Sequence, residues 1–299
     1  MADDHYVAQT YLKNFTNPNG MLIPYFKKGK IIVGKSKSPK SVCYVPEGSS
    51  NPHFNNPRIL EEFLTPLENN WNENLVKLER GEITPQVKFE IASYLSVLRV
   101  NTPTAIRQSR TRLESYANLT ASQELFHNDD FSQKLNDKKY AHARNLFILD
   151  QLPITLCSSD WKVLFANGNN FLTSDNPLCL YYPNVNSTDG WFYAPLKPNI
   201  ALLIWPDLKY SEIIKERRYD ELPEGNIEYG KIKSKFIFKY NQNLVRHAEE
   251  KVFFNQEADW ITRLVKLNRG WKAVAQVDTI PQPDGYLSIF RDVVKENQD

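Results

Sequence analysis

The chain has 299 residues, of which 41% are hydrophobic and 24% are charged, a composition that excludes an intrinsically disordered protein. Its formal net charge is +2, so the chain as a whole has no field that attracts a polyanion. No stretch approaches the roughly 20 apolar residues that span a bilayer, and the chain does not start with a basic region followed by an apolar run. We therefore expect no membrane association and a cytoplasmic location.

The first 57 residues predict a short helix followed by a β-hairpin. Val7, Tyr11 and Phe15 recur at the spacing of one helix face, and a turn cluster of Asn, Pro and Gly follows them. Strands are expected over residues 21–26 and 30–33, on either side of a Lys-Lys-Gly turn. The rest of this part is rich in Ser, Pro and Asn and is expected to be an irregular connection.

Residues 29–36 match the phosphate-loop pattern G-x-x-x-x-G-K-S letter for letter. Such a loop needs a helix that begins at its lysine, here Lys35, so that the helix N-terminus faces the phosphates. The interior letters are Lys-Ile-Ile-Val, which are typical of a strand, and Pro39 follows shortly afterwards. We therefore interpret the segment as the second strand of the hairpin and not as a nucleotide site.

Residues 58–152 carry the pattern of helices. Leu67, Trp71 and Leu75 lie on one helix face, a second helix is expected from Thr84, and a third is expected over residues 134–152.

A capping box marks the start of the first helix. Thr65 can act as the N-cap, Pro66 fits the first helical position, and Glu68 follows the cap by three residues. We therefore expect this helix to begin at Thr65, with Glu68 reaching back to the cap.

After residue 160 the period changes to that of short strands separated by Asn, Gly, Pro and Asp. An antiparallel or mixed sheet is expected from strands over residues 161–165, 171–173, 178–182, 191–193, 200–205 and 234–238. A closing helix is expected over residues 241–255.

Helices gathered first and strands gathered later predict an α+β fold rather than a regular βαβ alternation. We expect a single domain over residues 1–255, with an N-terminal segment and hairpin (1–57), a helical part (58–152) and a sheet part (153–255). Residues 256–299 are expected to be a poorly defined C-terminal extension.

Several established catalytic motifs are missing from the sequence. It contains no H-E-x-x-H, no G-x-S-x-G and no G-x-G-x-x-G, which disfavours a serine hydrolase and a Rossmann dehydrogenase. The remaining candidates are polar residues in apolar surroundings. His5 precedes an amphipathic segment and is a candidate general acid–base, because imidazole titrates near neutral pH. The alternative is that His5 only caps that segment.

Glu61 and Glu68 are a second group of candidates. They stand seven residues apart, so one continuous helix would place both carboxylates on nearly the same face, where they could hold Mg²⁺ or Mn²⁺. The alternative is that Pro66 separates them and Glu68 serves only the cap.

The segment of residues 171–177 runs from an apolar strand into Thr-Ser-Asp-Asn and stops at a proline. Rigid scaffolds often present catalytic side chains at strand ends, which makes Asp175 a candidate base or metal ligand. The alternative is an Asx-turn that closes the strand.

Basic residues are candidates for holding an anionic substrate. Lys28 and Lys30 belong to a lysine-rich part of the hairpin without acidic residues, which could contact phosphates or simply be solvated. Arg99, Arg107 and Arg110 would share a face if the second helix continues past the proline after Thr102. Guanidinium groups suit phosphate, and they equally suit salt bridges.

Residues 5–15, His-Tyr-Val-Ala-Gln-Thr-Tyr-Leu-Lys-Asn-Phe, resemble the opening signature of the bacterial domain-of-unknown-function family 4238 (DUF4238). That signature is usually His-Tyr-Val-Pro-Gln followed by Tyr-Leu and Phe, so Ala8 replaces a proline. The Thr-Pro pair at residues 102–103 and the segment 171–177 match in order as well, although Asn101 stands where the family commonly has Arg. The resemblance implies membership over residues 5–255 but supplies no reaction.

Two hypotheses of function follow. The first is a hydrolase of phosphodiesters, a nuclease of the host-defence or toxin kind, with the basic hairpin holding nucleic acid. Its catalytic residues would be His5, Glu61, Glu68 and Asp175, which we expect to meet in one cleft, with a Mg²⁺ or Mn²⁺ ion on Glu68 and Asp175. Its substrate-binding residues would be Gln9, Lys28, Lys30, Arg99, Ser174 and Asn176. The second hypothesis is a non-catalytic binding module with a polar, aromatic-lined pocket.

Overall fold

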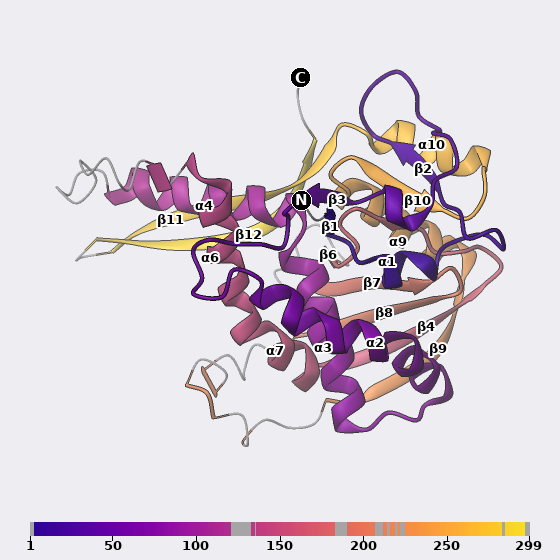
Figure 1. Ribbon diagram of the computed structural model, residues 1–299, viewed down its shortest axis with the longest axis horizontal. Helices are drawn as coiled ribbons and strands as arrows, with labels where there is room; N and C mark the ends of the chain where they lie inside the picture. The colour runs from indigo at the N-terminus through magenta and orange to yellow at the C-terminus, as the bar shows by residue number, and fades with distance from the viewer. Residues whose placement is uncertain are drawn as a thin grey trace.

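The computed structural model describes residues 3–120, 133–134, 136–182, 190–206, 212–213, 216–218, 221, 225–282 and 285–296. The chain has an α+β fold, in which a five-stranded sheet lies between helices and is flanked by a smaller sheet and a long two-stranded ribbon (Figure 1). Among the described helices, none combines the length and the apolar character that crossing a membrane requires.

The central sheet has five strands in the order β6-β7-β8-β4-β9. They are β4 (Asp160–Asn167), β6 (Cys179–Tyr181), β7 (Trp191–Lys197), β8 (Ile200–Trp205) and β9 (Ile227–Lys233). Neighbouring strands are antiparallel except for β4 and β9, which run parallel. The prediction of an antiparallel or mixed sheet in this part of the chain is confirmed.

Both faces of the central sheet are buried, which explains the nearly unbroken apolar run of β8. Leu202 and Ile204 belong to the core on one face, whereas Ala201 and Leu203 belong to the core on the other. The helices α2 (Ile59–Arg80), α3 (Pro85–Val100) and α7 (Leu152–Ser158) cover the first face, and α9 (Ser234–His247) covers the second (Figure 1). The helix α10 (Asp259–Asn268) packs against α9 and β2 (Ile23–Phe26).

The predicted strand over residues 234–238 is wrong, because these residues form the first turns of α9. The alternating Phe236 and Phe238 that suggested a strand are both exposed. Ile237 and Leu244 are buried instead, and their spacing is that of one helix face.

The predicted helix over residues 241–255 is correct only as far as His247, where α9 ends. The strand β10 (Lys251–Phe254) follows and lies at the centre of a three-stranded antiparallel sheet, between β2 (Ile23–Phe26) and β5 (Thr173–Ser174). Thus β10 joins the hairpin near the start of the chain to the polar segment around residue 175.

The N-terminal segment forms the hairpin that the sequence predicts. Val33 is bridged to Tyr25 and Lys37 to Leu22, both antiparallel, and Gly29 turns the chain at a φ of +82°. All of residues 29–36 are described, and no helix begins at Lys35. The antiparallel return of the chain after Gly29 is confirmed, but the second strand predicted over residues 30–33 is wrong, because only isolated bridges at Val33 and Lys37 form there.

Further short elements belong to the N-terminal segment, including a 3-10 turn, η1 (Pro39–Ser41). The strand β1 (Asp3–His5) pairs antiparallel with β3 (Tyr44–Pro46), and α1 (Gln9–Lys13) follows β1 directly. Tyr11 anchors α1, because its hydroxyl donates to the Pro195 carbonyl at 2.6 Å and lies 2.8 Å from the Thr173 hydroxyl. The Tyr11 ring also packs against Trp71 of α2.

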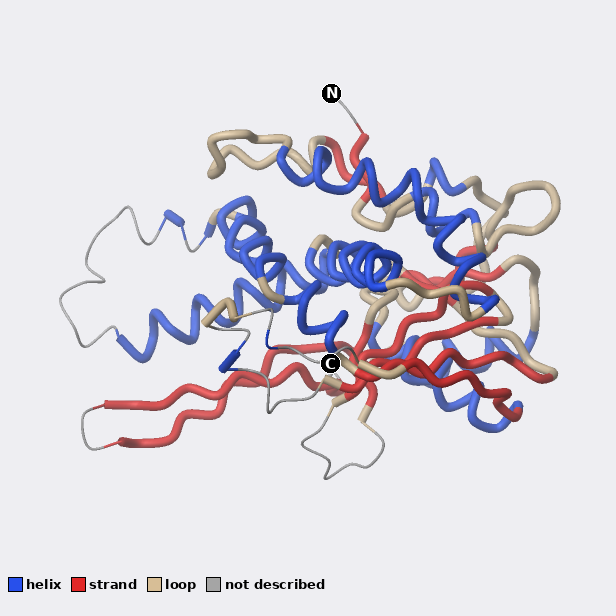
Figure 2. The backbone as a smooth tube through the Cα atoms, turned by 90° about the horizontal axis from the view of Figure 1, so that it is seen from below, coloured by secondary structure: helices blue, strands red, loops and turns tan. Residues whose placement is uncertain are grey.

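The remaining elements extend from one end of the body. There α4 (Pro103–Thr120) lies beside the ribbon of β11 (Trp271–Gln282) and β12 (Gly285–Glu296), as Figure 2 shows.

The single helix predicted over residues 134–152 is replaced by three elements. They are α6 (Lys138–Leu146), a 3-10 turn, η3 (Phe147–Asp150), and the start of α7. Pro153 begins α7 because proline fits the first helical turn but not a helix interior. The C-terminal extension that was expected to be poorly defined, over residues 256–299, contains α10 and the ribbon of β11 and β12.

Candidate functional site

Four of the predicted site residues line one open pocket: His5, Gln9, Glu61 and Glu68. We call this cavity of about 360 Å³ the His5 pocket. Its walls come from β1, α1 and α2 and from the loop after β3. The full lining consists of Asp4, His5, Gln9, Thr10, Lys13, Ser49, Glu61, Leu64, Thr65 and Glu68.

The predicted capping box is wrong, because α2 begins at Ile59 and contains Pro66 in its interior. Thr65 is a mid-helix residue whose hydroxyl donates to the Glu61 carbonyl at 2.7 Å. Hence Glu61 and Glu68 lie on a single helix, two turns apart, and both face the His5 pocket. In contrast, the second predicted helix does begin at Thr84, whose hydroxyl caps it by accepting the Val87 amide at 3.3 Å.

Hydrogen bonds orient the His5 ring. Its Nε2 lies 3.1 Å from the Lys40 carbonyl, which can only accept, so this nitrogen carries the proton. The other ring nitrogen, Nδ1, therefore accepts from the Gln9 side-chain amide at 3.4 Å. These two contacts fix the direction of the ring and place it against the Gln9 side chain.

The pocket brings several carboxyl groups close together. Glu61 is hydrogen-bonded to the Asp4 carboxyl and ion-paired with Arg58. Burial and the bond to Asp4 raise the pKa of Glu61, while Arg58 acts in the opposite direction. Burial also raises the pKa of Glu68; the repulsion from Glu61 adds to this effect, and Lys13 opposes it. Both glutamates therefore hold their protons at a higher pH than a free glutamate does.

Asp4 and Lys13 are pocket residues that the sequence reasoning missed. Asp4 also accepts the Ser49 amide at 3.1 Å, which joins β1 to the loop after β3. Lys13 could have been found from its spacing, since it follows Gln9 by four residues and so shares its face of α1.

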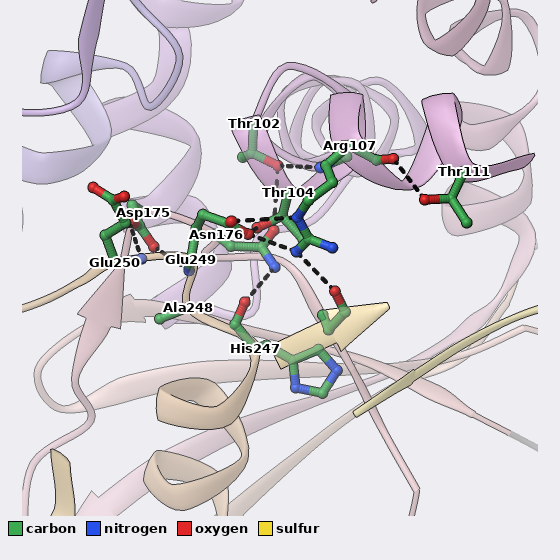
Figure 3. A network of polar contacts seen from close by, with 12 residues as sticks. Thr102, Thr104, Arg107, Thr111, Asp175, Asn176, His247, Ala248, Glu249 and Glu250 are labelled. Carbon is green, nitrogen blue, oxygen red and sulfur yellow. Dashed lines mark hydrogen bonds and ion pairs between the residues drawn. The ribbon is translucent and has the colours of Figure 1, made fainter. Parts of the chain in front are cut away.

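Asp175 does not line the His5 pocket, so the predicted meeting of His5 and Asp175 in one cleft is wrong. Its side chain is only 1% exposed, and it accepts the backbone amides of Glu249, Glu250 and Lys251 at 2.9, 2.8 and 2.8 Å (Figure 3). Burial raises the pKa of Asp175 to about 6, and the three amides act to lower it. We assign Asp175 the structural role of holding the turn before β10, in place of a base or metal ligand.

Ser174 and Asn176 are fully buried beside Asp175. The Ser174 hydroxyl accepts the Asn176 amide at 3.1 Å, as in a turn, and the Asn176 side chain donates to the His247 carbonyl at 3.0 Å. The turn alternative therefore describes this segment, and neither residue lines the His5 pocket.

The basic candidates also lie outside the His5 pocket. Lys28 is ion-paired with Glu250 at 2.8 Å, and Lys30 is exposed. Arg99 is ion-paired with Asp292 of β12, and Arg107 is ion-paired with Glu249 at 2.6 Å. The salt-bridge alternative thus holds for both arginines. The face that Arg99 was expected to share is interrupted, because α3 ends at Val100 and α4 begins three residues later.

The described residues do not offer a set of metal ligands. Within them, no group of three or more His, Cys, Asp or Glu side chains is placed to hold a metal ion. Both oxygens of Asp175 are bonded to backbone amides. The expected Mg²⁺ or Mn²⁺ ion on Glu68 and Asp175 therefore does not fit this arrangement.

The family described as "Protein of unknown function (DUF4238)" matches residues 4–258 of the chain, a span that contains every residue of the His5 pocket. The resemblance seen in the sequence is confirmed. No curated protein and no solved structure matches the chain.

Replacing Asp175 with Asn tests its structural role. An amide has only one oxygen and points an N–H₂ group at backbone donors, so at least one buried amide loses its acceptor. We expect Asp175→Asn to lower the free energy of unfolding by about 1–3 kcal/mol or more in urea denaturation. Glu257 is exposed, and Glu257→Gln makes the same change of charge. This control should alter the free energy of unfolding by less than about 0.5 kcal/mol. An unchanged unfolding midpoint for Asp175→Asn would contradict this role.

The raised pKa of Glu68 predicts how stability depends on pH. At low pH the carboxyl is protonated in both the folded and the unfolded chain, so it has no effect. As the pH rises, the unfolded chain releases the proton first, and the folded state loses stability. Glu68→Gln removes this loss, so its Tm should rise relative to wild type between about pH 4 and pH 7.

Glu62→Gln, on the exposed side of the same helix, is the matched control and should show no such gain. A Glu68→Gln variant that becomes less stable relative to wild type as the pH rises would show that the ionised carboxylate is stabilised in the folded protein, contrary to the assignment.

Proposed function

The chain belongs to the DUF4238 family, and we propose that the His5 pocket is the active site of a hydrolase that works by general acid–base catalysis. The observation that supports this proposal is the raised pKa of both Glu61 and Glu68, two turns apart on one side of an open polar pocket. Carboxyl groups tuned in this way can protonate a leaving group at a pH where a free glutamate cannot.

The two glutamates have different neighbours, which suggest different roles. Lys13 is the one neighbour whose charge acts to lower the pKa of Glu68. We therefore assign Glu68 as the general acid that protonates the leaving group. Glu61 is paired with Arg58, and together with Asp4 it forms a carboxyl pair that can accept a proton from an attacking water. Seven residues of helix span about 10 Å along its axis, which leaves room for a scissile bond and a water between the two groups.

His5 acts as a positioning residue in this scheme. Both of its ring nitrogens are engaged, by the Lys40 carbonyl and by the Gln9 amide. The imidazole thereby fixes the direction of Gln9, which faces the same pocket as the two glutamates. We expect Gln9 to hydrogen-bond the substrate.

The charge of the pocket favours a polar substrate without negative charge. Three carboxyl groups line it, from Asp4, Glu61 and Glu68, against the single cation of Lys13. A glycosidic bond is a group that paired carboxyls hydrolyse by acid and base action, and the hydroxyl groups of a sugar suit the polar lining. A glycoside is therefore the substrate class that we place first.

The nuclease hypothesis stays a prediction, and one observation favours it. A second cavity, of about 510 Å³, is lined by Arg107, Arg110, Lys138 and Lys139 and by only one carboxylate, Glu249. Such a lining attracts a phosphate group. The non-catalytic binding module also stays a prediction, and absence of turnover would favour it.

A substrate panel tests the proposal directly. Purified protein is incubated with p-nitrophenyl glycosides, with bis(p-nitrophenyl) phosphate, and with mixed RNA and DNA in Mg²⁺ or Mn²⁺. We expect glycoside turnover that falls as the pH rises and Glu68 ionises. Glu61→Gln and Glu68→Gln should each reduce kcat by about 10²–10⁴-fold.

Glu62→Gln is the control for the loss of one negative charge on α2 and should keep full activity. Cleavage of the phosphodiester substrates that Glu61→Gln and Glu68→Gln leave unchanged would place the chemistry outside the His5 pocket. No turnover of any substrate would leave the binding module as the better hypothesis.

A further inference from the structure

A small cavity of about 160 Å³ lies between α3, α4 and β12, and it shares no residue with the His5 pocket. Figures 1 and 2 show the ribbon passing along α4 at this place. The cavity is lined by Arg99, Val100, Ala105, Gln108, Arg112, Asn145, Ile148, Leu152, Leu180, Phe192 and Asp292.

Three buried N–H groups from lining residues have no acceptor in the part of the chain that the structure describes. They are Nη1 of Arg99, Nε of Arg112 and the side-chain amide nitrogen of Gln108. Gln108 is 1% exposed and Arg99 is 9% exposed, so bulk water does not solvate them freely. A buried donor without an acceptor is costly, which makes three of them around one cavity an unusual arrangement.

The existing ion pairs do not balance the charge of the cavity. Arg99 and Arg112 each donate to a different oxygen of Asp292. Burial acts to raise the pKa of Asp292, but the two guanidinium charges outweigh it and hold the pKa below its usual value. Two cations therefore meet one carboxylate, and among the described residues that line the cavity Asp292 is the only acidic one. The local charge is +1, and the missing partner is one negative charge.

The remaining walls favour a small anion over a large ligand. Val100, Leu152, Leu180 and Phe192 are apolar and strengthen electrostatic interactions inside the cavity by excluding water. The volume of about 160 Å³ is well below the roughly 300–1,000 Å³ of pockets for drug-sized ligands. Water molecules alone could accept the free N–H groups, but they would leave the positive charge without a partner.

We propose that this cavity binds a small oxyanion, a carboxylate or inorganic phosphate, between the guanidinium groups of Arg99 and Arg112 and the amide of Gln108. The anion accepts the three free N–H groups and neutralises the unpaired positive charge. Guanidinium groups bind such anions through parallel N–H bonds. This binding does not depend on the hydrolase activity proposed above.

Titrations of the full-length protein with sodium phosphate, acetate and chloride at constant ionic strength test the proposal, with Tm as the readout. We expect a saturable rise of Tm with phosphate, acetate or both, and none with chloride. Gln108→Leu removes one donor while keeping the ion pairs, and it should weaken the anion affinity about tenfold. Arg263→Gln, which removes an exposed cation from α10 and lines neither this cavity nor the one around Arg107, should leave the affinity unchanged.

Asp292→Asn should change the anion affinity in the direction opposite to Gln108→Leu. It removes the internal carboxylate, so the anion affinity should increase, whereas a site that holds only water would show no anion dependence. If Asp292→Asn does not fold, the comparison of Gln108→Leu with Arg263→Gln still decides. A Tm that rises equally in wild type and Gln108→Leu, or does not respond to either oxyanion, would overturn the proposal and leave a cavity filled by water only.

Discussion

The carboxylate of Asp175 is the interaction on which the arrangement of the chain depends. It accepts three successive backbone amides at the turn between α9 and β10, and so fixes where β10 begins. β10 in turn pairs with β2 on one side and β5 on the other. The N-terminal hairpin is thereby held next to the polar segment that contains Asp175, by a strand that lies more than two hundred residues later in the chain than β2.

The same anchoring positions the candidate active site. Tyr11 reaches from α1 to Thr173 and Pro195, so α1 is held against the sheets while its other face presents Gln9 and Lys13 to the His5 pocket. The two family motifs therefore do meet, but through the Tyr11 hydroxyl rather than through His5 and Asp175. One motif supplies pocket residues, and the other holds them in place.

The His5 pocket places three carboxyl groups close together, which lowers the stability of the folded protein when they are ionised. Asp4, Glu61 and Glu68 would repel one another if all three were ionised, and the raised pKa values of the two glutamates express this repulsion together with burial. Structural ion pairs elsewhere do the opposite: Glu249, paired with Arg107, has a lowered pKa even though burial acts to raise it. Charge repulsion that raises pKa values and lowers stability is common at functional sites.

Local patterns in the sequence predicted the α+β fold and the strands β2, β4, β5, β6, β7 and β8, because the period of buried residues reflects the element that buries them. The other six described strands were not predicted. The same patterns misled where a local signal competed with tertiary contacts. Phe236 and Phe238 alternate like a strand but lie on the exposed side of α9. Thr65 and Pro66 imitate a helix start inside α2.

The candidate site was predictable in part for the same reason. Glu61 and Glu68 were found from their spacing and His5 from its chemistry, and the three do line one pocket. The role of Asp175 was not predictable, because its three amide partners lie 74 to 76 residues away in the sequence. No local pattern reports such a contact.

The central claim is that Glu61 and Glu68 of the His5 pocket keep their protons to a higher pH than a free glutamate does. A ¹³C NMR titration of the glutamate side-chain carboxyls measures this directly, with the Glu68 signal identified by its loss in Glu68→Gln and the Glu62 signal by its loss in Glu62→Gln. We predict that Glu68 titrates at a clearly higher pH than Glu62. A Glu68 midpoint equal to or below that of Glu62 would contradict the assignment of Glu68 as a general acid.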